Sequence, residues 1–176
     1  MEKIPESESE RLVIREVTYK DFDNLSLMLK DLEVMYAWEH SFSDVEVKEW
    51  IDNNIKSYRE DGTGYFTIIE KESGRFAGQA GLHYSVVQDK RILEIGYIFM
   101  KEFWNKGYAY EAAMFFIKQA FHKMEEKEIY ALIRPENYRS SGLAEKLGFN
   151  KISSFVKRYK EKDMIHDIYI LKKDSK

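Results

Sequence analysis

The pattern of apolar and polar positions divides the chain into strand-like and helix-like segments. Residues 12–17 (L-V-I-R-E-V) alternate between apolar and polar side chains, which predicts a first strand. Apolar residues then recur at helical spacing over residues 21–33, which predicts a helix. A second helix is predicted behind Ser43, because Ser43 and Glu46 form a capping-box pattern ahead of a new apolar stripe.

The middle of the chain is rich in strands, and the second half adds two more helices. The predicted strands are residues 65–70 and 75–84, joined by a hairpin turn at Glu72-Ser73-Gly74, and then 92–100, 128–133, 149–158 and 164–172. Helices are predicted after the turn at Gly107 and over residues 138–147. The order βααβββαβαββ predicts a mixed α/β (α+β) domain with antiparallel strands first and one helical crossover.

Length and composition favour one folded domain. A chain of 176 residues with 44% hydrophobic residues can bury a real core without staples. Residues 1–9 are expected to form a flexible tail ahead of a single domain over residues 10–176. The acidic, polar N-terminus does not resemble a secretory signal, and no apolar run approaches the ~18 residues that span a bilayer. We therefore expect a soluble cytoplasmic protein with no membrane partner.

Charge and residue usage exclude several classes of site. The formal net charge of −3 argues against nucleic acid as a partner, because phosphate-backbone binding needs a basic surface. The chain has no cysteine, so it has neither disulfides nor a thiolate nucleophile. Its four histidines show no metal-binding spacing, and no metal is expected.

The segment F-W-N-K-G-Y-A-Y-E-A-A, residues 103–113, follows a predicted strand and opens directly into a helix. A strand, a tight turn and a helix N-terminus gather free backbone N–H groups at the positive end of the helix dipole, which suits a phosphate-bearing ligand. The strand lies too far along the chain, and its turn is too poor in glycine, for a dinucleotide fingerprint. No G-x-x-x-x-G-K-[ST] loop is present either.

Together with other motifs, this turn resembles the GNAT superfamily of N-acetyltransferases, and within it the branch of ribosomal-protein N-terminal acetyltransferases (Rim type). The matching segments span nearly the whole chain: E-R-L-V-I-R-E-V, L-E-I-G-Y-I-F, the turn itself, P-E-N-Y-R-S-S-G-L-A-E-K-L-G-F and D-I-Y-I-L. The resemblance implies a single-domain GNAT fold, with a mixed, mostly antiparallel sheet splayed in the middle and helices on both faces. It also implies acetyl-CoA as cosubstrate and direct attack by an amine, without an acetyl-enzyme.

Two positions depart from the wider superfamily. Trp104 stands three residues before the turn glycine, where many members have Gln or Arg, although the Rim-type branch also has Trp there. Ala144 occupies the position of the tyrosine that protonates the leaving sulfur in many GNAT enzymes. A tyrosine acid at that position is therefore not expected in this chain.

The resemblance places the CoA site along the strand, the turn and the last helix. Strand amides near Ile98, Phe99 and Met100 would pair with the pantetheine arm, and the turn would hold the diphosphate through Asn105, Lys106, Gly107, Tyr108 and Ala109. Asn137 matches the asparagine that binds pantetheine, and Ser140 matches a serine near the thioester sulfur.

Structural alternatives remain open at each of these positions. Gly107 also suits an ordinary turn, and Lys106 a solvated surface position. Asn137 is also a good helix N-cap, and Ser140 a plain first-turn serine with Ser141 and Tyr138 as competitors. Glu111 lies in the first helical turn, where a carboxylate favours the dipole, and is expected to be structural.

Glu94 is the candidate general base. Strand parity puts Glu94 on the same face as Gly96, whose missing side chain leaves room for a ligand or another backbone. An exposed strand carboxylate without a catalytic role is the alternative. The acceptor pocket is predicted to include Tyr36 and Trp38, from the segment 34–42, and His83, with core packing as the alternative for each.

Amine basicity favours some acceptors over others. An α-amine with a pKa near ~8 is about a tenth neutral at pH 7, whereas a lysine amine near ~10.4 is almost fully protonated. With only a weak base in view, a protein N-terminal α-amine or a small-molecule amine (polyamine, amino sugar, antibiotic) is favoured. A non-catalytic CoA-binding module is the remaining alternative, and a monomer or homodimer is expected.

Overall fold

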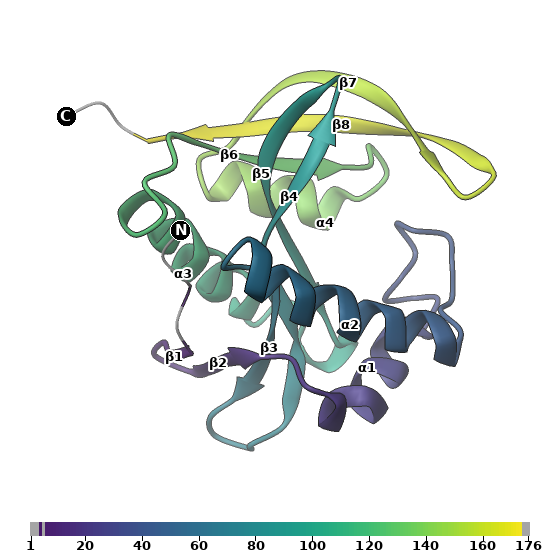
Figure 1. Ribbon diagram of the computed structural model, residues 1–176, viewed down its shortest axis with the longest axis vertical. Coiled ribbons are helices and arrows are strands. Elements are labelled where there is room, and N and C mark those ends of the chain that lie inside the picture. The colour runs from purple at the N-terminus through teal and green to yellow at the C-terminus, as the bar shows by residue number, and fades with distance from the viewer. Residues whose placement is uncertain (1–3, 5, 174–176) are drawn as a thin grey trace.

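A computed structural model describes residue 4 and residues 6–173 of the chain (Figure 1). The strands are β1 (Ser7–Glu8), β2 (Leu12–Glu16), β3 (Tyr65–Glu70), β4 (Phe76–Val87), β5 (Lys90–Phe99), β6 (Glu128–Ile133), β7 (Asn150–Tyr159) and β8 (Lys162–Lys172). The helices are α1 (Phe22–Leu29), α2 (Asp44–Glu60), α3 (Tyr108–His122) and α4 (Tyr138–Lys146), with short 3-10 turns η1 (Tyr19–Asp21) and η2 (Lys101–Phe103). None of the helices in these described ranges is long and apolar enough to cross a membrane.

The strands form one mixed sheet in the order β1-β2-β3-β4-β5-β6-β8-β7. Every neighbouring pair is antiparallel except β5 and β6, which run parallel and share a single register pair, Glu94 with Tyr130. By contrast, β4 and β5 stay paired along ten positions, from Val87–Lys90 to Gly78–Phe99. The sheet is therefore splayed between β5 and β6, as predicted.

Helices cover both faces of the sheet because consecutive strand residues point to opposite sides. The indole of Trp50, from α2, packs 5.0 Å from the ring of Tyr65 on one face. The next residue, Phe66, meets Phe116 of α3 on the other face, with ring centroids 5.4 Å apart. Figure 1 shows α2 crossing in front of the central strands, and α4 lying beneath the half of the sheet that contains β6 and β8.

Helix α1 is shorter than predicted. It ends at Leu29 rather than near residue 33, and Leu32, which fits the helical apolar stripe in the sequence, is exposed. The cause is Asp31, whose side-chain Oδ1 accepts hydrogen bonds from the backbone N–H groups of Glu33 (2.8 Å) and Val34 (3.3 Å). This local turn competes with the helix and sends the chain into the loop toward α2.

The N-terminal residues also differ from the flexible tail predicted over residues 1–9. Ile4 is fully buried, and its N–H donates to the carbonyl of Gly62 over 3.0 Å. Strand β1 pairs with β2, and the hydroxyl of Ser9 donates to Glu111 of α3 over 2.6 Å. Residues 4 and 6–9 therefore belong to the folded domain, while residues 1–3 and 5 lie outside the described part of the chain.

Candidate active site

The larger of two adjoining cavities, with a volume of about 420 Å³, runs between the splayed end of β5, the turn before α3 and helix α4. Most of the residues predicted to bind CoA line this cavity: Ile98, Phe99, Asn105, Gly107, Tyr108, Ala109, Asn137 and Ser140. Met100 and Lys106 lie outside it. The N–H of Met100 bonds to Ala77 O in the sheet, and the ammonium of Lys106 lies over the ring of Phe103.

The turn before α3 places an uncapped helix N-terminus beside this cavity. Gly107 is the N-cap of α3 and has φ of 80°, which L-residues rarely adopt, and no side chain caps the helix there. Arg11, the residue before β2, braces the turn: its guanidinium donates to Lys106 O (2.8 Å) and to Glu111 (2.7 Å). Glu111 is thus structural, as expected, and the N–H groups at this helix end remain available to an anion.

Of the two roles that were left open for Asn137, the structure shows the helix cap. Its side-chain Oδ1 accepts from the backbone N–H of Ser140 over 3.1 Å, which caps α4, and from the hydroxyl of Tyr36. Within the described part of the chain, its side-chain Nδ2 makes no hydrogen bond. The cap and Tyr36 therefore fix the amide so that Nδ2 can donate to a ligand in the larger cavity.

Helix α4 also contributes two cations that line the larger cavity. The guanidinium of Arg139 lies 4.2 Å from the ring centroid of Trp104, and the ammonium of Lys146 lies 4.9 Å from that of Tyr110. The two cations are seven positions apart in the sequence, so they lie two helical turns apart on one face of α4. Both are well placed for the negative charges of a phosphorylated ligand.

The smaller cavity, with a volume of about 120 Å³, contains Glu94 and adjoins the larger one. The two cavities share the lining residues Ala37, Trp38, Tyr97, Asn137 and Ser140. At this junction the hydroxyl of Tyr97 donates to Ser140 O over 3.1 Å. Burial raises the pKa of Tyr97, so the phenol stays protonated. A ligand extended along the larger cavity would thus present its end to a second ligand beside Glu94.

Glu94 is a buried carboxylate, with 8% of its surface exposed. The hydroxyl of Ser85 donates to its Oε2 over 2.6 Å, and Nε2 of His83, the cross-strand partner of Glu94, lies 3.2 Å from the same oxygen. Burial raises the pKa of Glu94, but His83, Ser85 and the charge of Lys157 together outweigh it, so the net pKa is lowered. The carboxylate is therefore ionised at neutral pH. His83, predicted to bind substrate, lies outside both cavities and contacts Glu94 instead.

The space beside Gly96 is occupied, which corrects the expectation that it would be open to a ligand or a backbone. A Cβ built at Gly96 would fall 1.8 Å from the hydroxyl of Tyr65. The phenol of Tyr65 lies over Gly96 and lines the smaller cavity next to Glu94. Burial raises the pKa of Tyr65, so a neutral phenol lies next to the carboxylate.

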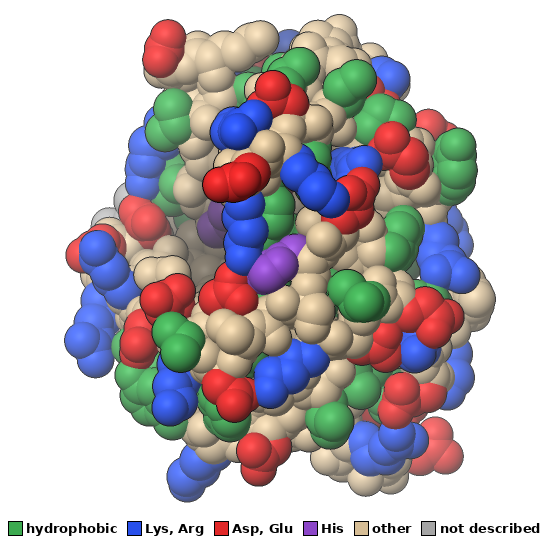
Figure 2. Space-filling view, turned by 90° about the vertical axis from the view of Figure 1, so that its right-hand side faces the viewer, with side chains coloured by type: hydrophobic (Ala, Val, Ile, Leu, Met, Phe, Trp, Pro, Cys, Tyr) green, Lys and Arg blue, Asp and Glu red, His purple; other side chains and the backbone are tan. Residues whose placement is uncertain are grey.

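The outer wall of the smaller cavity is formed by the loop between α1 and α2 and by the β7–β8 hairpin. Tyr36 and Trp38, both predicted to bind substrate, come from this loop, although Tyr36 lines only the larger cavity. Figure 2 views this side of the molecule, where acidic, basic and histidine side chains gather beside a hollow.

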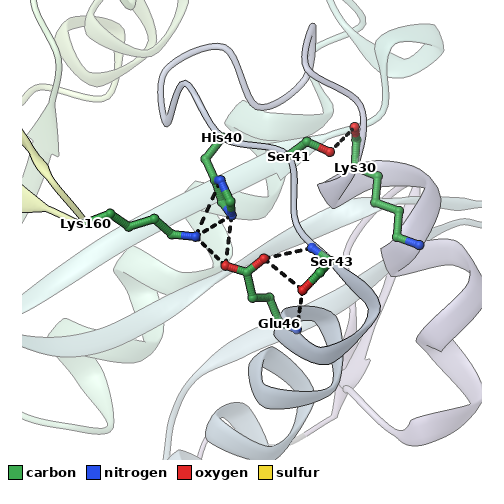
Figure 3. A network of polar contacts seen from close by, with 6 residues as sticks. All are labelled: Lys30, His40, Ser41, Ser43, Glu46 and Lys160. Carbon is green, nitrogen blue, oxygen red and sulfur yellow. Dashed lines mark hydrogen bonds and ion pairs between the residues drawn. The ribbon is translucent and has the colours of Figure 1, made fainter.

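Two ionic contacts tie the loop and helix α2 to the hairpin. Glu39 accepts from Arg134 (2.7 Å) and from Lys162 (2.8 Å). Lys160, at the hairpin tip, reaches both Glu46 and His40, and Glu46 also closes the capping box with Ser43 (Figure 3). The pKa of Glu46 is lowered to about 2, chiefly by Lys160, and that of Glu39 to about 2 by Lys162 and Arg134.

Several lining residues were not anticipated from the sequence: Tyr65, Tyr97, Arg134, Arg139, Lys146, Lys157, Tyr159, Met164 and His166. Only the conspicuous Gly96 pointed toward one of them, because a missing side chain on a buried strand face requires a neighbour that fills the space. The hairpin residues reach the site by tertiary folding alone, and no local pattern indicates it.

Comparison with known proteins agrees with this geometry. A family profile described as "Acetyltransferase (GNAT) domain" matches residues 11–150. The uncharacterized N-acetyltransferase p20 of Bacillus licheniformis is 30% identical over 164 residues, which cover 92% of each chain.

Two solved structures share the fold. The ribosomal-protein-S5-alanine acetyltransferase of Vibrio fischeri superimposes with a TM-score of 0.77 at 18% identity, covering 97% of this chain and 98% of that one. The spermidine N-acetyltransferase of Vibrio cholerae, in complex with CoA and spermine, gives a TM-score of 0.73 at 19% identity, covering 93% and 97%. Proteins with very different acceptors thus share this architecture, so the fold does not identify the acceptor.

Proposed function

Because the chain belongs to the GNAT family of acetyltransferases, we propose that it transfers the acetyl group of acetyl-CoA to a primary amine held beside Glu94. The observation that carries the proposal is the junction of the two cavities at Tyr97, Asn137 and Ser140. One cavity suits a phosphorylated, extended cosubstrate, and the other holds an ionised carboxylate at its wall. Acetyl-CoA supplies the activated thioester.

The residues of the larger cavity fit CoA. Free backbone N–H groups at the start of α3 suit the diphosphate, and the unpaired Nδ2 of Asn137 suits a pantetheine carbonyl. Beyond Glu94, β5 has no pairing with β6, so backbone N–H groups on that side of the strand are open to the pantetheine arm, although the carbonyl of Phe99 already accepts from the indole of Trp104 (2.7 Å). Such donors polarise a thioester carbonyl where negative charge develops.

In the smaller cavity, Glu94 acts as the general base. It accepts a proton from the amine, directly or through water, as the new C–N bond forms and the C–S bond breaks. Because the pKa of Glu94 is lowered, it is a weak base, which suits an amine that is already partly neutral near pH 7. An α-amine, of a small molecule or a protein N-terminus, therefore fits better than a lysine side chain.

The leaving thiolate needs a hydrogen-bond donor at the junction of the two cavities. Ala144 cannot supply one, but the hydroxyl of Ser140 and the phenol of Tyr97 both lie where the cavities meet. The phenol of Tyr97 already donates its proton to Ser140 O, so we assign the hydrogen bond to the departing sulfur to the hydroxyl of Ser140.

Release of free thiol from acetyl-CoA tests the proposal, measured with the full chain against free amino acids, peptides, polyamines and amino sugars. Amine-dependent thiol release is the expected result. Tight CoA binding without release for any amine would instead favour a non-catalytic CoA-binding module. Absence of CoA binding by calorimetry would remove the proposal altogether.

A further inference from the structure

The inner face of the β7–β8 hairpin forms one side of the smaller cavity. Side chains alternate along a strand, so Lys157 and Tyr159 of β7 share a face, as do Met164 and His166 of β8. Lys157 and Met164 are direct cross-strand partners, and all four residues line the cavity. The hairpin thus places one lysine against a space whose walls are otherwise largely aromatic and apolar.

Lys157 differs from the other cations near this cavity. Arg134 is held by Glu39, Lys160 by Glu46, and Lys162 by Glu39. Within the described residues, Lys157 makes no ion pair or hydrogen bond. Its ammonium is therefore available to an anion that enters the cavity.

Apart from Arg134, which is paired with Glu39, the cavity lining therefore carries two unlike charges, Glu94 and Lys157, that do not neutralise each other by contact. Glu94 is its acidic lining residue, and no ion pair joins it to Lys157, although the lysine charge acts on the carboxylate. Burial lowers the pKa of His166, which also lines the cavity, so this histidine is neutral at physiological pH. An acceptor with one basic and one acidic group matches both charges, whereas a second cationic group would face Lys157.

We propose that the acceptor is a small primary amine that also bears a carboxylate, as a free amino acid does, and that Lys157 binds this carboxylate while the amine faces Glu94. The inference rests on the proposed acetyl transfer and selects the small-molecule form of it. A cavity volume of about 120 Å³ suits a small molecule.

The test compares amino acids with their amides, which keep the amine and lose the carboxylate. We expect Lys157→Gln to lower kcat/KM for the amino acid by about fivefold, through KM, while the amide changes little. Lys157→Glu is expected to make the amide a better substrate than the amino acid. The quantity compared between variants is the ratio of kcat/KM for the amino acid to kcat/KM for its amide. Differences in amine basicity and any indirect effect on Glu94 cancel in this comparison.

Arg158→Gln is the matched control. Arg158 is the next residue of the same strand, its side chain points to the other face, and it pairs with Asp163 over 3.0 Å. Its substitution removes the same charge and leaves the acid-to-amide ratio unchanged. An acid-to-amide ratio of kcat/KM that is the same in wild type and Lys157→Gln would overturn the inference while leaving acetyl transfer intact. Equal kcat/KM values for peptides, amides and acids would have the same consequence.

A direct binding measurement separates failure of the inference from failure of the proposed function. If no amine releases thiol from acetyl-CoA, acetyl transfer is the part that fails. Calorimetry of the same acid and amide, with CoA present, then decides the role of Lys157. If the wild type binds the acid more tightly than the amide and Lys157→Gln does not, the role of Lys157 is supported. If the wild type and Lys157→Gln bind the acid equally well, the role is contradicted.

Discussion

At the scale of single residues, the chemistry depends on a carboxylate that is buried and yet charged. An isolated buried carboxylate would be protonated, because burial disfavours the charged form. Glu94 avoids this through the hydroxyl of Ser85 and the ring of His83, both from the neighbouring strand β4. These two residues position the base and keep it ionised, but they do not line the cavity themselves.

We expect Glu94→Gln to lower kcat by about a hundredfold, the lower end of the usual range for a general base, because the lowered pKa makes Glu94 a weak one. The rate should then rise only at higher pH, where the amine is neutral without help, and the affinity for acetyl-CoA should not change. Rates measured across pH and calorimetry check this result. Glu49→Gln, on the exposed surface of α2, is the control, and an unaltered pH profile would remove Glu94 from this role.

Two substitutions separate the two roles of Asn137. Asn137→Ala removes both the cap of α4, at a cost of about 1 kcal/mol, and the donor Nδ2. Asn137→Asp keeps a capping oxygen but loses the donor, so it should fold with near wild-type stability and bind CoA about tenfold more weakly. Urea melts and calorimetry measure the two effects. Undiminished CoA affinity in Asn137→Asp would leave Asn137 as a cap alone.

At the scale of elements, the sequence predicts most helices and strands because their apolar periods and caps are local. The capping box at Ser43 and the turn at Gly107 begin α2 and α3 where expected. Helix α1 was overestimated because the turn made by Asp31 competes with continued helix. The predicted tail was wrong for residues 4 and 6–9, because Ile4 is buried and hydrogen-bonded to Gly62, a residue far along the chain.

The proposed CoA cavity was easier to predict than the proposed acceptor cavity, for a physical reason. A diphosphate is bound by backbone at one turn, so its binding site is a contiguous sequence motif. The acceptor cavity is assembled from β3, β5, the α1–α2 loop and the β7–β8 hairpin. Its residues, such as Tyr65 and Lys157, are brought together only by the packing of distant elements.

Helix α4 provides a prediction at this scale. We expect Arg139→Gln and Lys146→Gln to weaken CoA binding by about three- to fivefold each, because both exposed cations line the cavity where the phosphates of CoA are proposed to bind. Dephospho-CoA lacks the 3′-phosphate. If Lys146 contacts this phosphate, Lys146→Gln should weaken the binding of dephospho-CoA less than it weakens the binding of CoA. Calorimetry with both ligands measures the difference. Lys118→Gln, outside the larger cavity, is the control.

At the scale of the whole molecule, the loop, α2 and the hairpin are joined by exposed ion pairs rather than by a core. The pKa values of Glu39 and Glu46 are lowered in the folded state to about 2. Groups with lowered pKa values contribute stability that is fully present above their unfolded pKa, near 4.5, and lost as pH falls toward 2.

We therefore expect the hairpin tip near Lys160 to loosen between about pH 4.5 and 2, before the sheet unfolds. Amide hydrogen exchange over residues 159–162, measured as pH is lowered and corrected for intrinsic rates, checks this expectation. The double variant Lys160→Met, Lys162→Met should exchange faster at neutral pH and lose the pH dependence. Protection that stays constant down to pH 2 would contradict it.

The single residue pair between β5 and β6 has a mechanical consequence. The two halves of the sheet meet there with almost no backbone hydrogen bonds between them. A pantetheine arm lying along β5 would supply the missing hydrogen bonds. The cosubstrate would then stiffen the seam as well as deliver the acetyl group, so CoA should raise the melting temperature and couple the two halves into one cooperative unit.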